Sequence, residues 1–420
     1  MPEYVVTPWE VRGNVNYDKL IKEFGTEKID KKLLNRMKNN AGELHHFLRR
    51  GIFFSHRDMN WVLDEYERGN KFYLYTGRAP SGPVHLGHLI PWIFTKWLQD
   101  KFDVKLLFQI PDEEKFLFKD KLSLEDTKKW AYENILDIIA VGFDPKKTMI
   151  FLDTEYAKTM YKHACRVAKK ITFSTTKAVF GFKNSNNIGE IFYTAMQSVP
   201  AFLPSIMEGK TTPCLIPYAI DQDPHFRITR DVAPLLDYPK PAALHCRFLP
   251  GLQGMSGEGK MSSSVESTCI FTTDRPKQVK DKIMKHAFSG GRRNVEEHRK
   301  LGGNPDVDVS YQWLTFFEED DKKLKKVART LFQSYRGDDI VARIEENQFA
   351  ILLPNVDESG AGVTVERIHE NLHDYKKKSN DPSMKFYIGA STAADTSRLE
   401  TILDQAQAIV VLAKKKEPTD

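Results

Sequence analysis

The sequence predicts an α/β fold in which helices cover a parallel sheet, and two patterns carry that prediction. Between residues 72 and 152, short apolar runs alternate with longer amphipathic stretches in the order strand, helix, strand, helix, strand. Another apolar run at 214–220 precedes a helical stretch at 226–236. Such alternation is typical of a parallel sheet with helices on both faces. We therefore expect a Rossmann-like domain over residues 71–274.

The expected elements follow the same apolar spacing along the rest of the chain. Residues 1–70 predict a helical N-terminal extension, with helices near 18–24, 31–38 and 58–68. In the Rossmann-like domain the expected strands are 72–75, 104–110, 149–152 and 214–220, and the expected helices are 86–102, 124–140 and 226–236. A helical region at 275–325 should contain helices at 276–287, 295–301 and 309–317.

The last region, 326–420, predicts a small α+β tail. Two apolar strands at 340–344 and 349–353 flank a polar turn and suit a hairpin. A helix at 358–374, a strand at 384–390 and a helix at 398–414 are expected to follow.

Composition excludes several classes of protein. The 420 residues include 41% hydrophobic and 28% charged residues, and no apolar run approaches the ~20 residues that span a bilayer. The amino terminus lacks the pattern of a secretory signal, so we expect a cytoplasmic protein without a membrane partner. The four cysteines form no C-x-x-C pair, so no zinc site is predicted, and we expect them to be reduced and buried.

Charge is distributed unevenly along the chain. The net charge is +5, but residues 340–420 contain 10 basic and 13 acidic side chains. The positive excess therefore lies on the first 339 residues, where any surface for a polyanionic partner is expected.

The loop 76–88 follows the first predicted strand and leads directly into a helix. It contains three glycines and two histidines, Gly77, Gly82, Gly87, His85 and His88. The carboxyl end of a parallel strand and the amino end of a helix attract phosphate through free N–H groups and the helix dipole. The histidines are three residues apart, so both should lie on one face of the first helical turn. This loop is the first candidate for a nucleotide site.

A second candidate segment begins about 170 residues later, at 257–264. Its sequence is Gly-Glu-Gly-Lys-Met-Ser-Ser-Ser, a glycine-flanked loop with one ammonium group, that of Lys260. A lysine on such a loop can stabilise the charge that develops on a leaving pyrophosphate.

These two segments, Pro80–His88 and Lys260–Ser264, resemble the HIGH and KMSKS motifs of class I aminoacyl-tRNA synthetases. Five further segments narrow the resemblance to the archaeal and eukaryotic tryptophanyl-tRNA synthetases. They are Thr7–Val11, Phe54–Asp58, Thr95–Gln99, Ala178–Phe182 and Ala219–Pro224. The resemblance extends over about residues 4–325.

The resemblance implies a set of functional residues. For ATP they are Arg78, Pro80, Ser81, His85, Gly87, His88, Lys115, Lys260, Met261 and Ser262, of which His85, His88, Lys260 and Ser262 would be catalytic. For tryptophan they are Tyr75, Gln109, Glu114 and Gln222. Glu114 would pair with the ammonium group, and the other three offer hydrogen bonds to the indole N–H or the amino-acid backbone.

The resemblance also implies the reaction and its partners. It implies a ligase that forms tryptophanyl-adenylate and charges tRNA(Trp), with Mg²⁺ bound to ATP as substrate, no metal held by the protein, and a homodimeric assembly. Pro111 stands where the family usually has threonine, and it removes a main-chain N–H beside the amino-acid pocket.

The tail departs from that family. The segment around Arg343–Pro354 resembles the second half of a diguanylate cyclase (GGDEF) domain, but the hairpin turn reads Glu-Glu-Asn-Gln. Neutral amides replace carboxylates poorly as ligands of a hard cation, so no cyclase activity is expected. The chain would thus keep only part of the family's anticodon-binding region.

Two alternatives to a tryptophan enzyme stay open from the sequence. One is a tyrosine-specific relative, whose pocket would serve a phenol instead of an indole. The other is a non-catalytic or chimeric protein that uses a synthetase-like body for binding and the tail for regulation.

Overall fold

The computed structural model describes most of the first 291 residues and parts of the remainder. The described residues are 4–6, 11–13, 15–254, 261, 267, 269–291, 304, 307–321, 340–345, 348–352, 358–379, 388, 390, 391 and 406. The chain forms two compact units, residues 1–288 and 289–420.

A seven-stranded sheet is the centre of the first unit and confirms the predicted α/β class. Its strand order is β3-β4-β9-β8-β5-β6-β7. The parallel strands are β5 (Tyr73–Gly77), β6 (Lys105–Ile110), β7 (Thr148–Leu152), β8 (Cys214–Ala219) and β9 (Ala242–Cys246). β3 (Glu27–Lys28) and β4 (Phe53–Arg57) add an antiparallel edge.

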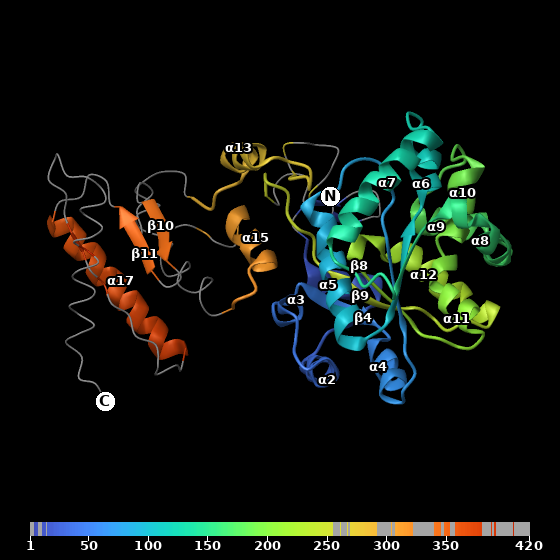
Figure 1. The fold of residues 1–420 in the computed structure, drawn as a ribbon, viewed down its shortest axis with the longest axis horizontal. Coiled ribbons are helices and arrows are strands. Elements are labelled where there is room, and N and C mark those ends of the chain that lie inside the picture. Colours follow the sequence, from blue (N-terminus) through green and yellow to red (C-terminus); the bar gives the residue numbers. More distant parts are fainter. Residues whose placement is uncertain are drawn as a thin grey trace. The chain divides into compact units, whose positions relative to one another are not determined.

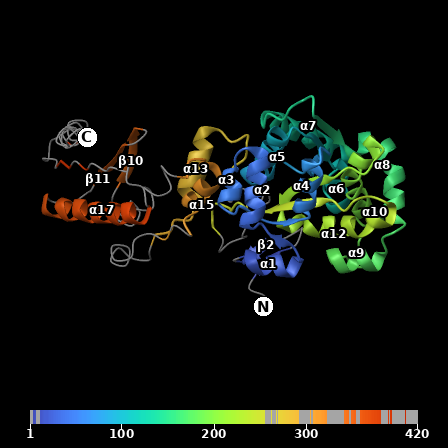
Figure 2. The same cartoon turned by 90° about the horizontal axis from the view of Figure 1, so that it is seen from below.

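Helices lie on both sides of this sheet, and α5 (Leu86–Phe102) and α12 (Asp223–Val232) are on opposite faces (Figures 1 and 2). Successive side chains of a strand point to opposite faces of the sheet, so alternate residues pack against the helices on each face. On the α5 side, Trp92 packs edge-to-face on Phe108 with ring centroids 5.4 Å apart. On the α12 side, Tyr75 packs edge-to-face on Phe226 at 5.9 Å.

From residue 59 onward, the first unit contains eight further α-helices among its described residues. They are α4 (Met59–Glu67), α6 (Asp112–Phe118), α7 (Leu124–Ala140), α8 (Asp153–Ala168), α9 (Phe173–Phe180), α10 (Ile188–Met196), α11 (Leu203–Glu208) and α13 (Pro276–His286). α8 to α11 fill a stretch for which the sequence predicted no element. The helix expected at 226–236 ends at Val232, because Pro234 cannot continue it and instead begins a short 3₁₀ turn.

The N-terminal region combines helices with strands, whereas only helices were expected there. The helices are α1 (Tyr17–Phe24), α2 (Lys31–Ala41) and α3 (His46–Arg49), and β1 (Tyr4–Val6) pairs with β2 (Val11–Gly13). β4 was missed because all of its first four residues are buried, so it shows no alternation of apolar and polar side chains.

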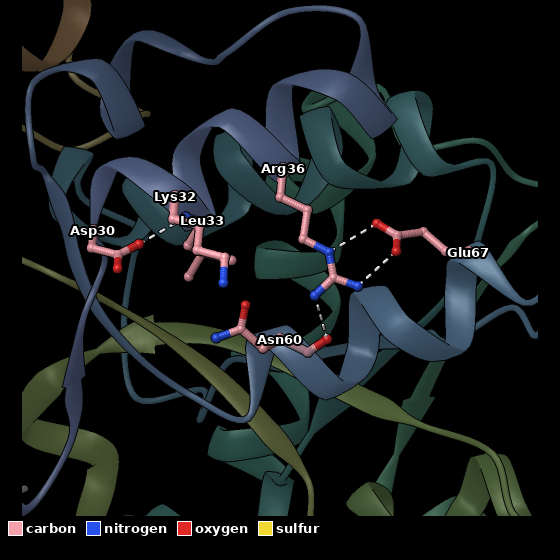
Figure 3. Close-up of a pocket in the computed structure, with 6 residues that line it drawn as sticks. All are labelled: Asp30, Lys32, Leu33, Arg36, Asn60 and Glu67. Atoms are coloured by element: carbon pink, nitrogen blue, oxygen red, sulfur yellow. Dashed lines mark hydrogen bonds and ion pairs between the residues drawn. The ribbon is translucent and has the colours of Figure 1, made fainter.

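Figure 3 shows how α2 is attached to α4, at a pocket lined by Asp30, Lys32, Leu33, Arg36, Asn60 and Glu67. Arg36 Nη2 lies 2.7 Å from Glu67 Oε2, and Arg36 Nη1 donates to the main-chain oxygen of Asn60 at 3.1 Å. Asp30 accepts from the N–H of Leu33 and so caps α2, and none of the predicted site residues lines this pocket.

The second unit contains α15 (Val309–Phe317), the hairpin β10 (Ile340–Glu345) and β11 (Gln348–Leu352), and α17 (Glu358–Ser379). The hairpin is antiparallel, so its prediction is confirmed. α17 buries Thr364, Ile368 and Leu372, which are four residues apart and share one face. The helices expected at 295–301 and 398–414 and the strand at 384–390 lie largely outside the described residues.

None of the described helices combines the length and the apolar composition needed to cross a bilayer. Cys214, Cys246 and Cys269 are buried as expected, but the prediction was wrong for Cys165, which is exposed. Cys165 lies on α8, whose buried face is formed by other positions, among them Ala164 and Val167.

Candidate active site

The predicted site residues gather where the parallel strands end. Gly77 ends β5 and Arg78 follows it, α6 follows β6, and Gln222 lies just after β8. In the sheet, β6 and β7 lie on one side of β5, and β8 and β9 lie on the other side. The order of the strands therefore reverses its direction at β5. Ligands of open α/β sheets bind at such a switch point, outside the carboxyl ends of the strands.

The two histidines lie together at the amino end of α5. The main-chain N–H of His85 donates to His88 Nδ1 at 3.1 Å, and the two rings stack with centroids 3.6 Å apart. A Cβ at Gly87 would lie 3.1 Å from atoms of the His85 ring, so glycine leaves room for the imidazole. This arrangement places two ring systems at the amino end of a 17-residue helix, where the helix dipole favours an anion.

Met261, from the segment 257–264, lies beside Gly87 of the loop 76–88. Its side chain is buried, its N–H donates to the main-chain oxygen of Leu249 at 3.2 Å, and its Cβ would lie 3.6 Å from a Cβ at Gly87. Lys260 and Ser262 lie outside the described residues. Met261 itself is thus held at the amino end of α5.

Arg78 is a buried cation, and part of its guanidinium group makes no hydrogen bond within the described chain. Its Nη1 donates to the main-chain oxygen of Ala79 at 2.7 Å, while Nε and Nη2 have no hydrogen-bond partner among the described residues. Burial lowers the pKa of Arg78 to about 10, against the opposing effect of Glu114 and Asp137. Unpaired buried donors are costly, so this guanidinium is suited to an anionic ligand that completes its bonds.

Pro80 and Ser81 belong to the loop between β5 and α5, where Pro80 is buried and Ser81 is partly exposed. α7 supports this loop, because the buried Asn134 donates from Nδ2 to the main-chain oxygen of Gly82 at 3.0 Å. The loop is therefore held at the strand ends by a packed helix.

A buried hydrogen-bonded group forms on the α12 side of the sheet. Tyr75 donates to Gln109 Oε1 at 2.5 Å and accepts from Gln197 Nε2 at 2.9 Å, and Tyr193 donates to Gln197 Oε1. Burial raises the pKa of Tyr75 well above its ordinary value, so its hydroxyl is neutral. Gln197 was missed by the sequence analysis because it follows α10 in a segment without any recognisable motif.

Glu114 and Lys115 form an ion pair, with Lys115 Nζ 2.6 Å from Glu114 Oε1. Tyr193 lies 3.4 Å from the other oxygen of Glu114. Lys115 was expected with the ATP residues, and in this structure its ammonium neutralises the carboxylate expected to bind the amino acid. Pro111 precedes α6, and its oxygen accepts from the N–H of Glu114 at 3.3 Å, so its missing N–H costs the helix no hydrogen bond.

Three acidic residues of α6 and α8 lie beside this group. Asp112 accepts from the N–H of Thr154 at 3.1 Å and so caps α8. Asp153, the first residue of α8, accepts from Gln109 Nε2 at 2.6 Å, and its carboxyl group is hydrogen-bonded to that of Glu113. No group of ligands suited to a metal ion occurs among the residues that the structure describes.

The buried carboxyl of Glu113 should make stability fall as pH rises. Burial raises the pKa of Glu113 from 4.5 to about 7, so between these values the folded chain binds more protons than the unfolded chain. The free energy of unfolding then decreases by up to about 1.4 kcal/mol per pH unit in that window. In Glu113→Gln we expect a flatter dependence, measured by urea unfolding from pH 4.5 to 7.5.

The matched control is Glu155→Gln, which changes an exposed carboxylate on α8 that is paired with Lys128. It should leave the decrease with pH in place. A Glu113→Gln profile as steep as that of the unmodified chain would contradict the assignment.

The sequence profile described as tRNA synthetases class I (W and Y) matches residues 67–351, more than half of the chain. The chain belongs to this synthetase family. A tryptophan–tRNA ligase from Saccharolobus solfataricus is 56% identical over 326 residues, which cover 77% of this chain and 84% of the relative. The cytoplasmic tryptophan–tRNA ligase of Homo sapiens is 54% identical over 340 residues, covering 78% of this chain and 72% of the relative.

Solved structures of the synthetase family agree with the fold. A tryptophanyl-tRNA synthetase from Plasmodium falciparum superposes with a TM-score of 0.71 at 40% identity, covering 88% of this chain and 95% of that chain. One from Giardia lamblia gives a TM-score of 0.70 at 37% identity, covering 87% and 94%. Residues 317–419 also match the diguanylate cyclase GGDEF domain profile, so the resemblance of the tail is confirmed.

Proposed function

We propose that this chain is an ATP-dependent tryptophan–tRNA ligase, which forms tryptophanyl-adenylate and transfers the amino acid to tRNA(Trp). The observation that carries the proposal is the buried group Tyr75, Gln109 and Gln197 beside an unpaired Arg78. The N–H of Arg78 donates to the main-chain oxygen of Gln109 at 3.0 Å, which ties the two together. Tryptophan–tRNA ligases from archaea, yeast and human that are more than half identical over most of this chain support the same substrate.

The reaction needs positioning and charge stabilisation from the protein, and no protein nucleophile. The tryptophan carboxylate attacks the α-phosphorus of ATP, pyrophosphate leaves, and a terminal ribose hydroxyl of tRNA then takes the acyl group. Arg78, His85 and His88 would hold the phosphates at the amino end of α5. Lys260 and Ser262 would act on the leaving pyrophosphate, and Mg²⁺ would enter with ATP and supply further charge neutralisation.

Different residues would bind the indole and the ammonium group of tryptophan. Tyr75 and Gln109 would bind the indole N–H, because they are buried and already linked by hydrogen bonds. Glu114 would bind the substrate ammonium after its bond to Lys115 is exchanged, which would free Lys115 for a phosphate. Gln222, partly exposed after β8, would contact the amino-acid backbone.

The test is ATP–pyrophosphate exchange with each of the twenty amino acids, followed by charging of tRNA(Trp). Tryptophan alone should support exchange well above background. Exchange with tyrosine instead would favour the tyrosine-specific alternative, and no exchange with any amino acid by folded protein would favour the non-catalytic one.

We also expect the chain to form a homodimer in the cytoplasm. Leu136 and Ile139 on α7 and Ile188 on α10 are 64%, 60% and 85% exposed, as apolar side chains under a subunit interface would be in a single chain. The relatives from Saccharomyces cerevisiae and Homo sapiens are named as cytoplasmic.

Removal of residues 340–420 should leave exchange and tRNA affinity nearly unchanged. Phosphate contacts supply most of the affinity for RNA, and this segment has 13 acidic and 10 basic residues, so it should repel tRNA rather than hold it. Charging by the full chain should accordingly be weak, with the defect mainly in tRNA affinity. Exchange, tRNA affinity at fixed salt and charging are compared for the full and shortened chains.

Thermal unfolding of the shortened chain is the control, because loss of the tail could expose apolar surface of the second unit. Tight tRNA binding by the full chain that disappears on shortening would contradict the prediction. The GGDEF-like segment would then replace the missing part of the anticodon-binding region.

A further inference from the structure

Asp153 is a buried carboxyl group to which the reaction assigns no role. It is 1% exposed and stands at the junction of β7 and α8. β7 pairs with β6 in register, with Ile110 opposite Leu152. This pairing brings the carboxyl group at the end of β7 next to Gln109 on β6.

The contact with Asp153 decides which way the carboxamide of Gln109 faces. Gln109 Nε2 lies 2.6 Å from Asp153 Oδ2 and can only donate, so Oδ2 accepts and the NH₂ end points to Asp153. Gln109 Oε1 then faces Tyr75, whose hydroxyl must donate its single proton to it at 2.5 Å. Asp153 therefore determines, through Gln109, that the Tyr75 hydroxyl is the donor in this hydrogen bond.

Asp153 Oδ2 stays an acceptor even when the carboxyl group carries a proton. Burial beside Glu113 raises the pKa of both carboxyl groups. Gln109 Nε2 already donates to Oδ2, and Asp153 Oδ1 has no N–H or O–H donor in the rest of the described chain, so a proton bound to Asp153 lies on Oδ1.

A defined polarity follows at the hydroxyl of Tyr75. Its proton goes to Gln109, and one of its two acceptor positions is taken by Gln197 Nε2 at 2.9 Å. A single acceptor position remains. A substrate that meets this oxygen must bring a donor, which an indole N–H does and a ring oxygen does not.

We infer that Asp153 is a positioning residue of the amino-acid pocket, which fixes the Gln109 carboxamide so that the Tyr75 hydroxyl can only accept a hydrogen bond from the substrate. The inference rests on the proposed function, in which Tyr75 meets the indole N–H. It predicts that selectivity for a substrate ring with an N–H donor depends on the carboxyl group of Asp153, which does not touch the substrate.

The test compares tryptophan with benzofuranylalanine, in which oxygen replaces the indole N–H, in exchange kinetics and in calorimetric binding. The unmodified chain should prefer tryptophan by roughly 10²-fold in kcat/KM, the effect of one unmatched buried polar group. In Asp153→Asn the new amide can donate as well as accept, so Gln109 can turn over. The preference should fall at least ~10-fold, mainly through a higher KM for tryptophan, with kcat nearly unchanged.

The double variant Asp153→Asn/Gln109→Glu exchanges amide and carboxylate and again directs an acceptor at Tyr75. It should regain most of the lost preference, which a merely structural role of Asp153 would not produce. The control Asp112→Asn changes the neighbouring carboxyl group, which caps α8 through Thr154. It should lower the unfolding temperature and leave the preference unchanged.

The outcomes separate this inference from the proposed function. An unmodified chain that neither binds tryptophan nor supports exchange overturns the proposed function and, with it, this role of Asp153. Tryptophan-dependent exchange together with a preference unmoved in folded Asp153→Asn overturns the role of Asp153 alone. If Asp153→Asn does not fold, a folded double variant without the tryptophan preference overturns it equally.

Discussion

Tryptophan should support pyrophosphate exchange at least ~10⁴-fold better in kcat/KM than tyrosine or phenylalanine. A site that hydrogen-bonds a substrate N–H strongly rejects a side chain without one, because its own polar groups are then left buried and unpaired. Tyr75 and Gln109 are 1% and 0% exposed, so water cannot readily replace the missing partner. Initial rates of exchange over a range of amino-acid concentrations measure the ratio.

The source of this selectivity can be located with two matched tyrosines on β5. Tyr75→Phe removes the hydroxyl bonded to Gln109, and the ratio should fall by ~10- to 100-fold. Tyr73→Phe removes a hydroxyl on the same face that instead contacts Glu208 and Lys105 at the other end of the strand, and the ratio should not change. Equal turnover of tyrosine and tryptophan by the unmodified chain would refute the assignment.

Much of the sheet could be predicted because its strands and helices have their own local periodicity. β5, β6, β7 and β8 were expected within two residues of their observed bounds, and α5 and α7 at their observed bounds. β9 and β4 were missed because they are short and buried on both sides, which leaves no period to detect. Their place in the sheet depends on pairing with each other across about 190 residues of chain.

The site was predictable only where its residues are close in sequence. His85, Gly87 and His88 form one motif, and the structure keeps them together at the amino end of α5. Gln197, just after α10, bonds to Tyr75, and Asp153, on α8, bonds to Gln109, through hydrogen bonds that span 122 and 44 residues. Nothing in the local sequence marks such partners, because their role exists only after the sheet has formed.

The pairing of Lys115 with Glu114 shows a second limit of motif reasoning. The two residues are adjacent in sequence, yet were expected on different substrates. In the structure Lys115 Nζ lies 2.6 Å from Glu114 Oε1, so the two charges neutralise each other. A partly buried charge needs a partner, and here each of the two charges finds it in the adjacent residue.

Lys260→Ala should slow adenylate formation by roughly 10²–10³-fold while tryptophan affinity changes little. This is the scale of losing one preorganised contact to charge that develops in the transition state. Met261, the next residue, is fixed at the amino end of α5 by its bond to Leu249 and its place beside Gly87. Because Lys260 directly precedes Met261 in the sequence, we expect its ammonium group to serve phosphates bound at the helix, whereas the indole site depends on other residues.

Pre-steady-state kinetics of adenylate formation and a separate measurement of tryptophan binding decide the matter. Lys280→Ala is the matched control, because it removes an exposed ammonium from α13 and should leave both quantities unchanged. If Lys260→Ala loses tryptophan affinity and keeps the chemical rate, the loop supports the structure of the pocket. We expect a lower rate with unchanged tryptophan binding, and this pattern arises only if the ammonium group acts in the transition state. Loss of a contact made equally in the substrate complex and in the transition state would weaken binding and leave the chemical rate unchanged.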